Sequence, residues 1–302
     1  MTRRNLPAQG PLRRIAIVSK LGQPDGPDLA RNLGTWLGER GVQVFFDAET
    51  SSAIGGGGSG KEGFPRTTLP EETDLAIVAG GDGTLLSVAR AAAPRGVPIL
   101  GVNFGGLGFL TELQPDELFA GLERVLAGNY EIEERHAIRV RYLVDGTLRS
   151  EHALLNDVVI TKAALARMIT CHVRVDDDEV ATYTSDGLIV STPTGSTAYN
   201  LSAGGPILDP RMGAFVIAPI CPHTMTYRPL VVPGDVRIEI RLEQTTEQAY
   251  LTLDGQVGFP MQTGDTVLVD EYSETVKLVR VSSTGFFDVL RTKLRWGAGG
   301  GR

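Results

Sequence analysis

The sequence predicts an α/β domain followed by a separate, mostly β domain, on three observations. Up to about residue 128, short apolar runs alternate with amphipathic stretches of helical period, which is typical of a parallel sheet covered by helices. From Tyr130 onward, apolar residues recur at every second position and helical stretches are scarce. The chain has 302 residues, a length that suggests two domains. We therefore place the boundary near residue 129.

Strands and helices are predicted to alternate along the first domain. Helices are predicted from Pro27 to Gly41, over residues 85–93, and from Pro115 to Gly128, because leucine and other apolar residues recur there at helical spacing. Residues 1–11 are expected to be a mobile tail, and the glycine-rich residues 55–60 a flexible loop. The runs apolar enough for strands are residues 15–18, 42–46, 75–79 and 97–102.

The second domain carries the pattern of antiparallel strands. Apolar and polar residues alternate over residues 138–144 and 236–242. Asp145-Gly146 and Asp254-Gly255 are dipeptides that favour tight hairpin turns. We expect a ligand to bind in the crevice between the two domains.

Composition excludes several classes of protein. The formal net charge of −7 at pH 7 argues against non-specific nucleic-acid binding. No apolar run reaches the ~18 residues of a membrane span, and the first residues lack the apolar stretch of a signal peptide, so we expect a cytoplasmic protein with no membrane partner. Cys171 and Cys221 are isolated in sequence, and we expect them to be reduced, buried thiols and not metal ligands.

The strongest candidate site is the stretch Gly-Gly-Asp-Gly-Thr at residues 80–84. It follows a buried strand and precedes a helix, where open α/β sheets bind ligands, and its glycines let backbone N–H groups approach an anion. Two interpretations stay open on this basis. The stretch is either a phosphate site around the Asp82 carboxylate, or a tight turn in which Asp82 or Thr84 caps the helix.

Four further stretches contain residues suited to ligand binding. Residues 103–110 form a second loop after a strand, which either approaches a ligand or packs on its own aromatic side chains. Asn156-Asp157 offers an amide and a carboxylate that suit a base edge and ribose hydroxyls, or else is a turn pair. Residues 185–206 combine an unusual number of hydroxyls, glycines and prolines. His223 is interpreted as a structural histidine in preference to a catalytic base.

Together these motifs resemble those of the bacterial NAD kinase family. From about Ile15 to Trp296 the chain contains, in the family's order and at similar spacing, GGDGT, GVNFGGLGFLTEL, NDVV, SDGLIVSTPTGSTAYNLSAGGPILDP, CPHTMTYRPLVVP and LDGQ. GGDGT alone is shared with diacylglycerol, sphingosine and phosphofructokinase relatives, whereas the stretch STPTGSTAYNLSAGGPI is specific. Two positions depart from the family pattern: Asp157 stands where many members have Glu, and Gly106 where Asn is common.

The resemblance implies a domain organisation and a set of site residues. Residues 12–128, with a returning segment at 280–297, would form an α/β kinase domain like that of phosphofructokinase and lipid kinases. Residues 129–279 would form an all-β, sandwich-like domain that binds NAD. Asp82 would be the general base, with Gly83 beside it at the diphosphate. The other residues implied to contact NAD are Asn156, Asp157, Arg167, Thr184, Asp186, Thr197, Ala198, Tyr199, Asn200, Leu201, Ser202 and Gln256.

The implied reaction transfers the γ-phosphoryl group of ATP to the 2′-hydroxyl of the adenosine ribose of NAD, giving NADP. A positioned carboxylate accepts the hydroxyl proton, and a divalent cation such as Mg²⁺, for which no protein ligand is assigned, stabilises charge on the phosphoryl group. The resemblance also implies a homodimer or homotetramer. The sequence leaves open whether polyphosphate replaces ATP and whether NADH replaces NAD. The STPTGSTAY stretch argues against a lipid kinase that shares only GGDGT, and Asp82 argues against a catalytically silent dinucleotide-binding protein.

Overall fold

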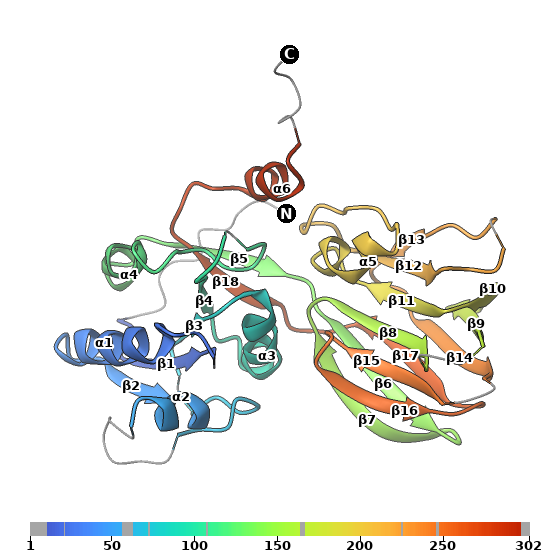
Figure 1. The fold of residues 1–302 in the computed structure, drawn as a ribbon, viewed down its shortest axis with the longest axis horizontal. Coiled ribbons are helices and arrows are strands. Elements are labelled where there is room, and N and C mark those ends of the chain that lie inside the picture. The colour runs from blue at the N-terminus through green and yellow to red at the C-terminus, as the bar shows by residue number, and fades with distance from the viewer. Residues whose placement is uncertain are drawn as a thin grey trace. The chain divides into compact units, whose positions relative to one another are not determined.

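The chain divides into two compact units (Figure 1). The computed structural model describes residues 11–20, 22–55, 63–71, 73–106, 108–163, 167–224, 226–245 and 248–296. One unit comprises Met1–Glu134 with Val276–Arg302, and the other comprises Arg135–Thr275. Apart from Pro11 and Gly55, the predicted tail and the predicted glycine-rich loop lie outside the described residues.

The first unit is built on a six-stranded sheet in the order β2-β1-β3-β4-β18-β5. Its strands are β1 (Arg14–Ser19), β2 (Gln43–Phe46), β3 (Leu75–Ala79), β4 (Ile99–Val102), β5 (Glu131–Arg135) and β18 (Val276–Arg280). β1 pairs in parallel with β2 and β3, and β4 pairs in parallel with β3 and β18. The loops that follow β1, β3 and β4 therefore lie at the same edge of the sheet, where open α/β sheets bind their ligands.

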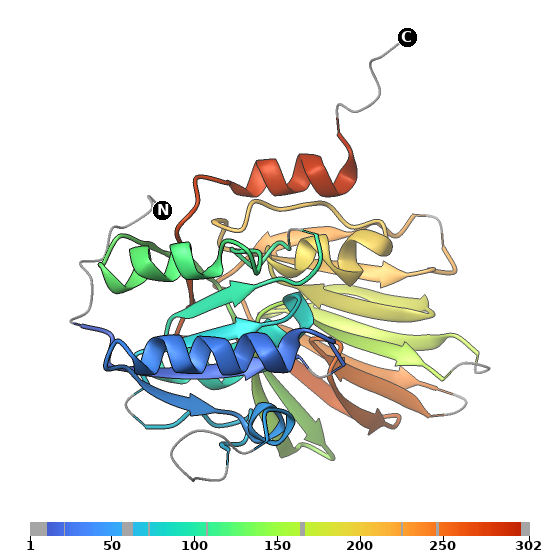
Figure 2. The same cartoon turned by 60° about the vertical axis from the view of Figure 1, so that its left-hand side comes forward.

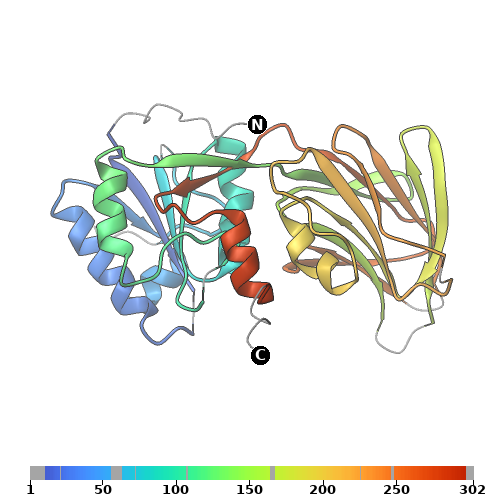
Figure 3. The same cartoon turned by 90° about the horizontal axis from the view of Figure 1, so that it is seen from above.

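Helices cover both faces of this sheet. They are α1 (Gly26–Gly38), α2 (Ala48–Ala53), α3 (Asp82–Ala92), α4 (Leu118–Leu126) and α6 (Phe286–Leu294), with a short 3₁₀ turn η1 (Ala93–Arg95). α1 and α4 lie side by side on one face, where Trp36 and Phe119 bring their ring centroids within 5.5 Å, and α3 lies on the other face (Figures 2 and 3). The helix α2 was not predicted, because six residues are too few for a helical period to appear.

The second unit consists of two six-stranded antiparallel sheets. One has the order β10-β9-β14-β17-β6-β7 and the other β13-β12-β11-β8-β15-β16. The strands are β6 (Ile138–Val144), β7 (Thr147–Leu154), β8 (Asp157–Lys162), β9 (Ile169–Val175), β10 (Asp178–Ser185), β11 (Gly187–Ser191), β12 (Ala214–Ile220), β13 (Leu230–Pro233), β14 (Ile238–Gln244), β15 (Ala249–Leu253), β16 (Val257–Met261) and β17 (Thr266–Glu271). Two short helical segments, η2 (Gly195–Thr197) and α5 (Tyr199–Ser202), interrupt the strands.

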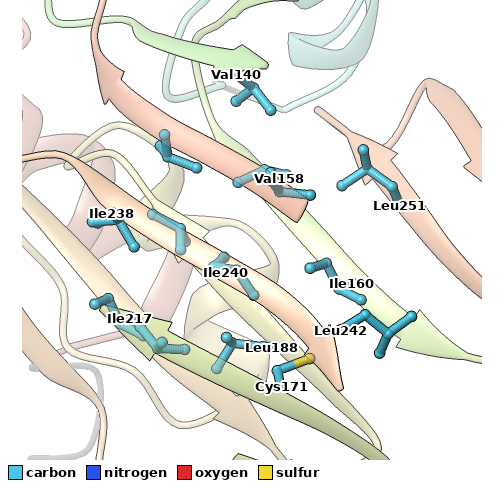
Figure 4. Packing of buried hydrophobic residues seen from close by; sticks show 14 of the residues in the cluster. Val140, Val158, Ile160, Cys171, Leu188, Ile217, Ile238, Ile240, Leu242 and Leu251 are labelled. Carbon is cyan, nitrogen blue, oxygen red and sulfur yellow. The ribbon is translucent and has the colours of Figure 1, made fainter. Parts of the chain in front are cut away.

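The core of the second unit lies between its two sheets (Figure 4). Val158, Ile160 and Leu188 from one sheet pack against Ile238 and Ile240 from the other, and all five are at most 1% exposed. This confirms the predicted fold class, an α/β domain followed by a β sandwich, because alternate residues of each strand face the shared core.

Both predicted hairpin turns form, whereas one prediction for the cysteines is wrong. Asp145-Gly146 and Asp254-Gly255 have positive φ at both positions, as a tight hairpin turn requires. Cys171 is buried in the sandwich core as expected. Cys221 is exposed, because it follows the end of β12 in a turn where its φ is 45°. None of the described helices is long and apolar enough to span a membrane.

Candidate functional site

The glycine-rich stretch turns from β3 directly into α3. The helix begins at Asp82, its N-cap is Gly81, and no side chain caps its first turn. Thr84 lies inside the helix, with Oγ1 2.6 Å from the position that a Cβ on Gly80 would occupy. The interpretation of Asp82 or Thr84 as the helix cap is therefore wrong. Gly81 has no side chain that could accept an N–H group of the first turn of α3, and the first turn of a helix is a position that favours an anion.

The carboxylate of Asp82 joins this turn to the loop after β4. Oδ2 accepts the N–H of Phe109 at 3.1 Å, and Oδ1 accepts the N–H of Leu110 at 3.2 Å. A carboxylate oxygen can accept two hydrogen bonds, so each oxygen keeps one lone pair for a further donor. The side chain is only partly buried. Asp82 is thus fixed in orientation and still able to accept a proton.

The close approach of Asp82 requires glycine at position 108. A Cβ on Gly108 would lie 2.3 Å from Asp82 Oδ1 and 2.3 Å from Thr111 Oγ1. The side chain of Asn103 shapes the start of the same loop, donating to the carbonyl of Gly106 at 2.6 Å and accepting the N–H of Gly105 at 3.2 Å. Gly106 uses its backbone carbonyl here, and a side chain on it would meet nothing within 4 Å.

Glu112 fastens the end of this loop, and sequence reasoning did not single it out. The side chain is 5% exposed; it accepts the N–H of Val281 at 2.8 Å and forms an ion pair with Arg280 at 2.9 Å. Arg280 also pairs with Glu133 at 2.6 Å. The only signal in the sequence was a charged residue within an apolar stretch. Glu112 therefore ties the loop that holds Asp82 to the chain that leaves β18.

The helix α6 packs on the same loop. The ring of Phe286 lies 6.1 Å from that of Phe109, and the ammonium of Lys293 lies 5.5 Å from the Phe109 ring centroid. Val289 and Leu290 of α6 are 8% and 3% exposed. Since the Phe109 N–H donates to Asp82, α6 rests on a residue that positions the carboxylate.

In the second unit, Asn156 and Asp157 lie at the start of β8, held by Asp254. The Asp254 carboxylate accepts the N–H groups of Leu155, Asn156 and Asp157 at 2.8 to 3.2 Å. Burial, with the nearby Asp254 charge adding to it, raises the pKa of Asp157 from its ordinary 3.8 to about 7. The side chain of Asn156 makes no hydrogen bond with any described residue. Asp254 was recognised in the sequence only as part of a turn, and Gln256 lies exposed just after that turn.

The segment that follows β11 packs against the same strand end. Gly195 approaches so closely that a Cβ on it would lie 2.2 Å from the carbonyl oxygen of Asn156. Thr192 donates to the carbonyl of Leu155 at 2.6 Å and accepts the N–H of Gly195 at 3.0 Å. Arg135, 2% exposed, lies behind the segment, with Nη1 3.4 Å from Thr194 Oγ1. The segment is therefore a folded wall beside Asn156.

The predicted NAD-binding residues of this segment differ in exposure. Asn200 is fully buried, and its amide donates to the carbonyls of Ser196 and Pro206 at 3.1 and 3.0 Å. These two hydrogen bonds hold the segment together. Thr197 donates to the carbonyl of Thr194 at 3.2 Å. Tyr199 and Ser202 are exposed, and Ala198 and Leu201 are partly buried.

Thr184 and Asp186 lie apart from Asn156 and Asp157. β8 and β11 are antiparallel, with Asp157 opposite Ser191 at one end and Thr161 opposite Gly187 at the other, so Asp186 lies at the far end of β8 from Asp157. Five steps of about 3.3 Å give about 17 Å between the two ends. Asp186 pairs with Lys162 at 3.8 Å, and Thr184 Oγ1 lies 3.4 Å from Thr170 Oγ1. Arg167 is exposed.

The side chain of His223 makes no hydrogen bond or ion pair with any of these predicted NAD-binding residues. Its backbone N–H donates to the carbonyl of Thr184 at 2.9 Å, which fits the structural role expected of it. Among the residues that the structure describes, no three His, Cys, Asp or Glu side chains come together to hold a metal ion.

Family models match both units of the chain. The model described as the ATP-NAD kinase N-terminal domain matches residues 15–130, and that of the ATP-NAD kinase C-terminal domain matches residues 155–281. The chain is 46% identical over 286 residues to the NAD kinase of Geotalea daltonii, covering 95% of this chain and 99% of that protein. It is 44% identical over 287 residues to the NAD kinase of Koribacter versatilis, again covering 95% and 99%.

Two solved structures share the fold. A yeast NADH kinase complexed with NADH superposes with a TM-score of 0.84 at 24% identity, covering 97% of this chain and 90% of that one. An NAD kinase from Archaeoglobus fulgidus in complex with ATP superposes with a TM-score of 0.69 at 26% identity, covering 93% and 98%.

Proposed function

This chain belongs to the NAD kinase family of enzymes, and from that premise we propose that it transfers the γ-phosphoryl group of ATP to the 2′-hydroxyl of the adenosine ribose of NAD, forming NADP. The relatives at 43% to 46% identity that match 95% of this chain are NAD kinases by name. Their agreement along nearly the whole chain supports the same activity here.

Asp82 is the general base of this reaction, and its geometry carries the proposal. A ribose hydroxyl is a poor nucleophile until a positioned group accepts its proton. Two backbone N–H groups hold the Asp82 carboxylate at the edge of the sheet while leaving each oxygen a free lone pair. The first turn of α3, which has no side-chain cap, supplies a dipole for the phosphoryl charge. Gly83 lies in that turn, where its backbone can approach the diphosphate.

The second unit binds NAD in this proposal, and its residues act in two groups. The first group contacts the adenosine half, where the amide of Asn156 suits the base edge and the carboxylate of Asp157 suits ribose hydroxyls. Its remaining members, Thr197, Ala198, Tyr199, Asn200, Leu201, Ser202 and Gln256, line the wall beside them. The second group, which also contacts NAD, consists of Arg167, Thr184 and Asp186.

The kinase and NAD-binding roles are divided between domains in this proposal. A divalent cation such as Mg²⁺, bound to the phosphates of ATP, would neutralise charge that develops on the transferred group. Residues 12–128 with 280–297 act as the kinase domain, and residues 129–279 as the NAD-binding domain. The enzyme works in the cytoplasm as a homodimer or homotetramer, and sedimentation of the purified protein tests that assembly.

The test of the proposed function is direct. The purified protein is incubated with NAD, ATP and Mg²⁺, and NADP is measured with an NADP-specific dehydrogenase. We expect NADP to form only when all three are present. Protein that is folded and binds NAD but forms no NADP with ATP or polyphosphate would refute the proposed function.

A further inference from the structure

A cavity of about 110 Å³ lies at the carboxyl end of β1, one strand away from the glycine-rich stretch. Strand β1 ends at Ser19, Pro27 belongs to the first turn of α1, and α2 closes the opposite side. The cavity is lined by Ser19, Lys20, Gly22, Pro27, Thr50 and Ala53. It occupies the ligand-binding edge of the parallel sheet, and the role proposed for Asp82 does not use it.

Ser19 places an unpaired hydroxyl in the wall of this cavity. The residue is 4% exposed, and its Oγ has no hydrogen-bond partner among the described residues. Its backbone is fully engaged, since the N–H donates to Thr50 Oγ1 at 2.8 Å and the carbonyl accepts from Arg66 at 2.6 Å. A buried hydroxyl without a partner costs free energy, so the arrangement favours a ligand that completes the bond.

Lys20 brings a positive charge between this cavity and the glycine-rich stretch. Its backbone N–H donates to the carbonyl of Ala79 at 2.8 Å, and its Cβ would lie 3.2 Å from a Cβ on Gly80. The side chain is exposed, and its ammonium pairs with no described residue. Lys20 therefore stands beside the turn that carries Asp82, free to meet an anion.

Two helix N-termini flank Lys20. The 13-residue helix α1 begins at Gly26, with Pro27 in its first turn and no side-chain cap, and Ser19 Oγ lies 3.0 Å from the position of a Cβ on Gly26. The helix α3 follows β3, the strand next to β1, and it begins after Gly81, again without a side-chain cap. Both helix dipoles and the ammonium favour negative charge at the same edge. The volume suits a phosphoryl group and is well below that of pockets for drug-sized ligands, which start at about 300 Å³.

We propose that Ser19, Lys20 and the first turn of α1 bind the phosphate chain of the phosphoryl donor. The phosphate chain of the donor then runs from this cavity, past Lys20, to the first turn of α3, where the terminal phosphoryl group of the donor faces Asp82. The inference rests on the proposed function, because it assigns a donor to a site whose acceptor side is Asp82. Nucleoside triphosphates and inorganic polyphosphates both contain the chain of phosphates that this site would bind.

The test compares Lys20→Met with Lys277→Met. Lys277 lies near the start of β18, at the opposite edge of the same sheet, so its replacement removes one charge from the same unit away from the site. Binding of inorganic tripolyphosphate and of ATP is measured by calorimetry, and the KM values for ATP and NAD are measured separately. Lys20→Met should raise the dissociation constant for tripolyphosphate and the KM for ATP about 10- to 100-fold, the worth of a hydrogen bond to a charged group. The KM for NAD should stay within about twofold, and Lys277→Met should match the wild type.

Ser19→Ala separates ligand binding from folding. If the hydroxyl serves only the ligand, this variant should melt no lower than the wild type and yet bind tripolyphosphate more weakly. Unchanged tripolyphosphate and ATP binding in Lys20→Met, or an equal loss in Lys277→Met, would overturn the proposal. Tripolyphosphate that binds through Lys20 and also serves as donor supports a polyphosphate-using enzyme, whereas binding without turnover supports a nucleotide donor. Lys20-dependent binding by a protein that forms no NADP would instead refute the proposed function and leave the phosphate site standing.

Discussion

Gly108→Ala should inactivate the enzyme by displacing Asp82. The new Cβ would lie 2.3 Å from Asp82 Oδ1, about 1 Å closer than a carbon and an oxygen normally approach. The carboxylate must then rotate or retreat, and its bonds to the N–H groups of Phe109 and Leu110 must lengthen. A misplacement of about 1 Å at a reacting group can cost about 10²-fold in rate. We therefore expect kcat to fall by about 10²-fold or more.

A matched control lies two residues away. Gly106 belongs to the same loop, and an added Cβ would meet nothing within 4 Å. Neither glycine has a positive φ, so alanine adds no backbone strain at either position. Gly106→Ala should keep kcat within about threefold of the wild type.

The assay measures kcat at saturating NAD and ATP, together with NAD affinity by calorimetry and the melting temperature. Overpacking at Gly108 should cost about 1 to 3 kcal/mol of stability, so the assay is run well below the melting temperature of the variant. NAD affinity should persist, because the second unit carries it in the proposed function. Wild-type kcat in Gly108→Ala, or an equal loss in Gly106→Ala, would refute the link between this loop and the base.

Three further predictions concern pH, the C-terminal helix and the redox form of the substrate. Burial raises the pKa of Asp157 from 3.8 to about 7, so the folded state holds this proton more tightly than the unfolded state. The stability that the proton contributes is full below about pH 3.8 and is lost progressively as pH rises to about 7, by about 4 kcal/mol in all. Between about pH 5 and about pH 8.5, urea unfolding should show the remaining part of that loss, about 2 to 3 kcal/mol, in the wild type and not in Asp157→Asn; an equal change in the two proteins would contradict it. Truncation after Ser283 removes the contact of Phe286 with Phe109, so hydrogen exchange should speed up across residues 12–128; unchanged protection there would contradict the packing role of α6. Because Thr184 is uncharged, the pocket should discriminate weakly between cationic NAD and neutral NADH, and a kcat/KM ratio beyond about a thousandfold would exclude this.

The sequence predicted those features of the fold and the site that are determined by local sequence pattern. Three glycines around Asp82 after a buried strand indicated the ligand-binding turn, and period-two alternation indicated the mostly β second domain. The partners of Asp82 could not be read in this way, because Phe109 and Leu110 lie 27 and 28 residues further along the chain. The cap interpretation failed for the same reason: a local rule assigned to the helix a carboxylate that a distant loop uses.

Long-range contacts account for the remaining omissions. Glu112 meets Arg280 168 residues later, so nothing near it in sequence revealed its partner. Asp254 was seen as a turn residue, yet its carboxylate binds three N–H groups almost 100 residues earlier. Cys221 was expected to be buried because isolated cysteines usually are, but its positive φ places it in an exposed turn.

The most direct test of the central claim is the turnover and NAD affinity of Asp82→Asn. Asparagine keeps the volume but cannot accept the ribose proton, so turnover should fall by about 10² to 10⁴-fold. It also loses one of the two acceptors for the loop, a change worth only about 1 kcal/mol, so the fold and NAD binding should survive. Turnover reduced by that amount with NAD affinity retained is the result we predict. Near-normal turnover would contradict the assignment of Asp82 as the base, and loss of NAD affinity together with loss of the fold would return Asp82 to a structural role.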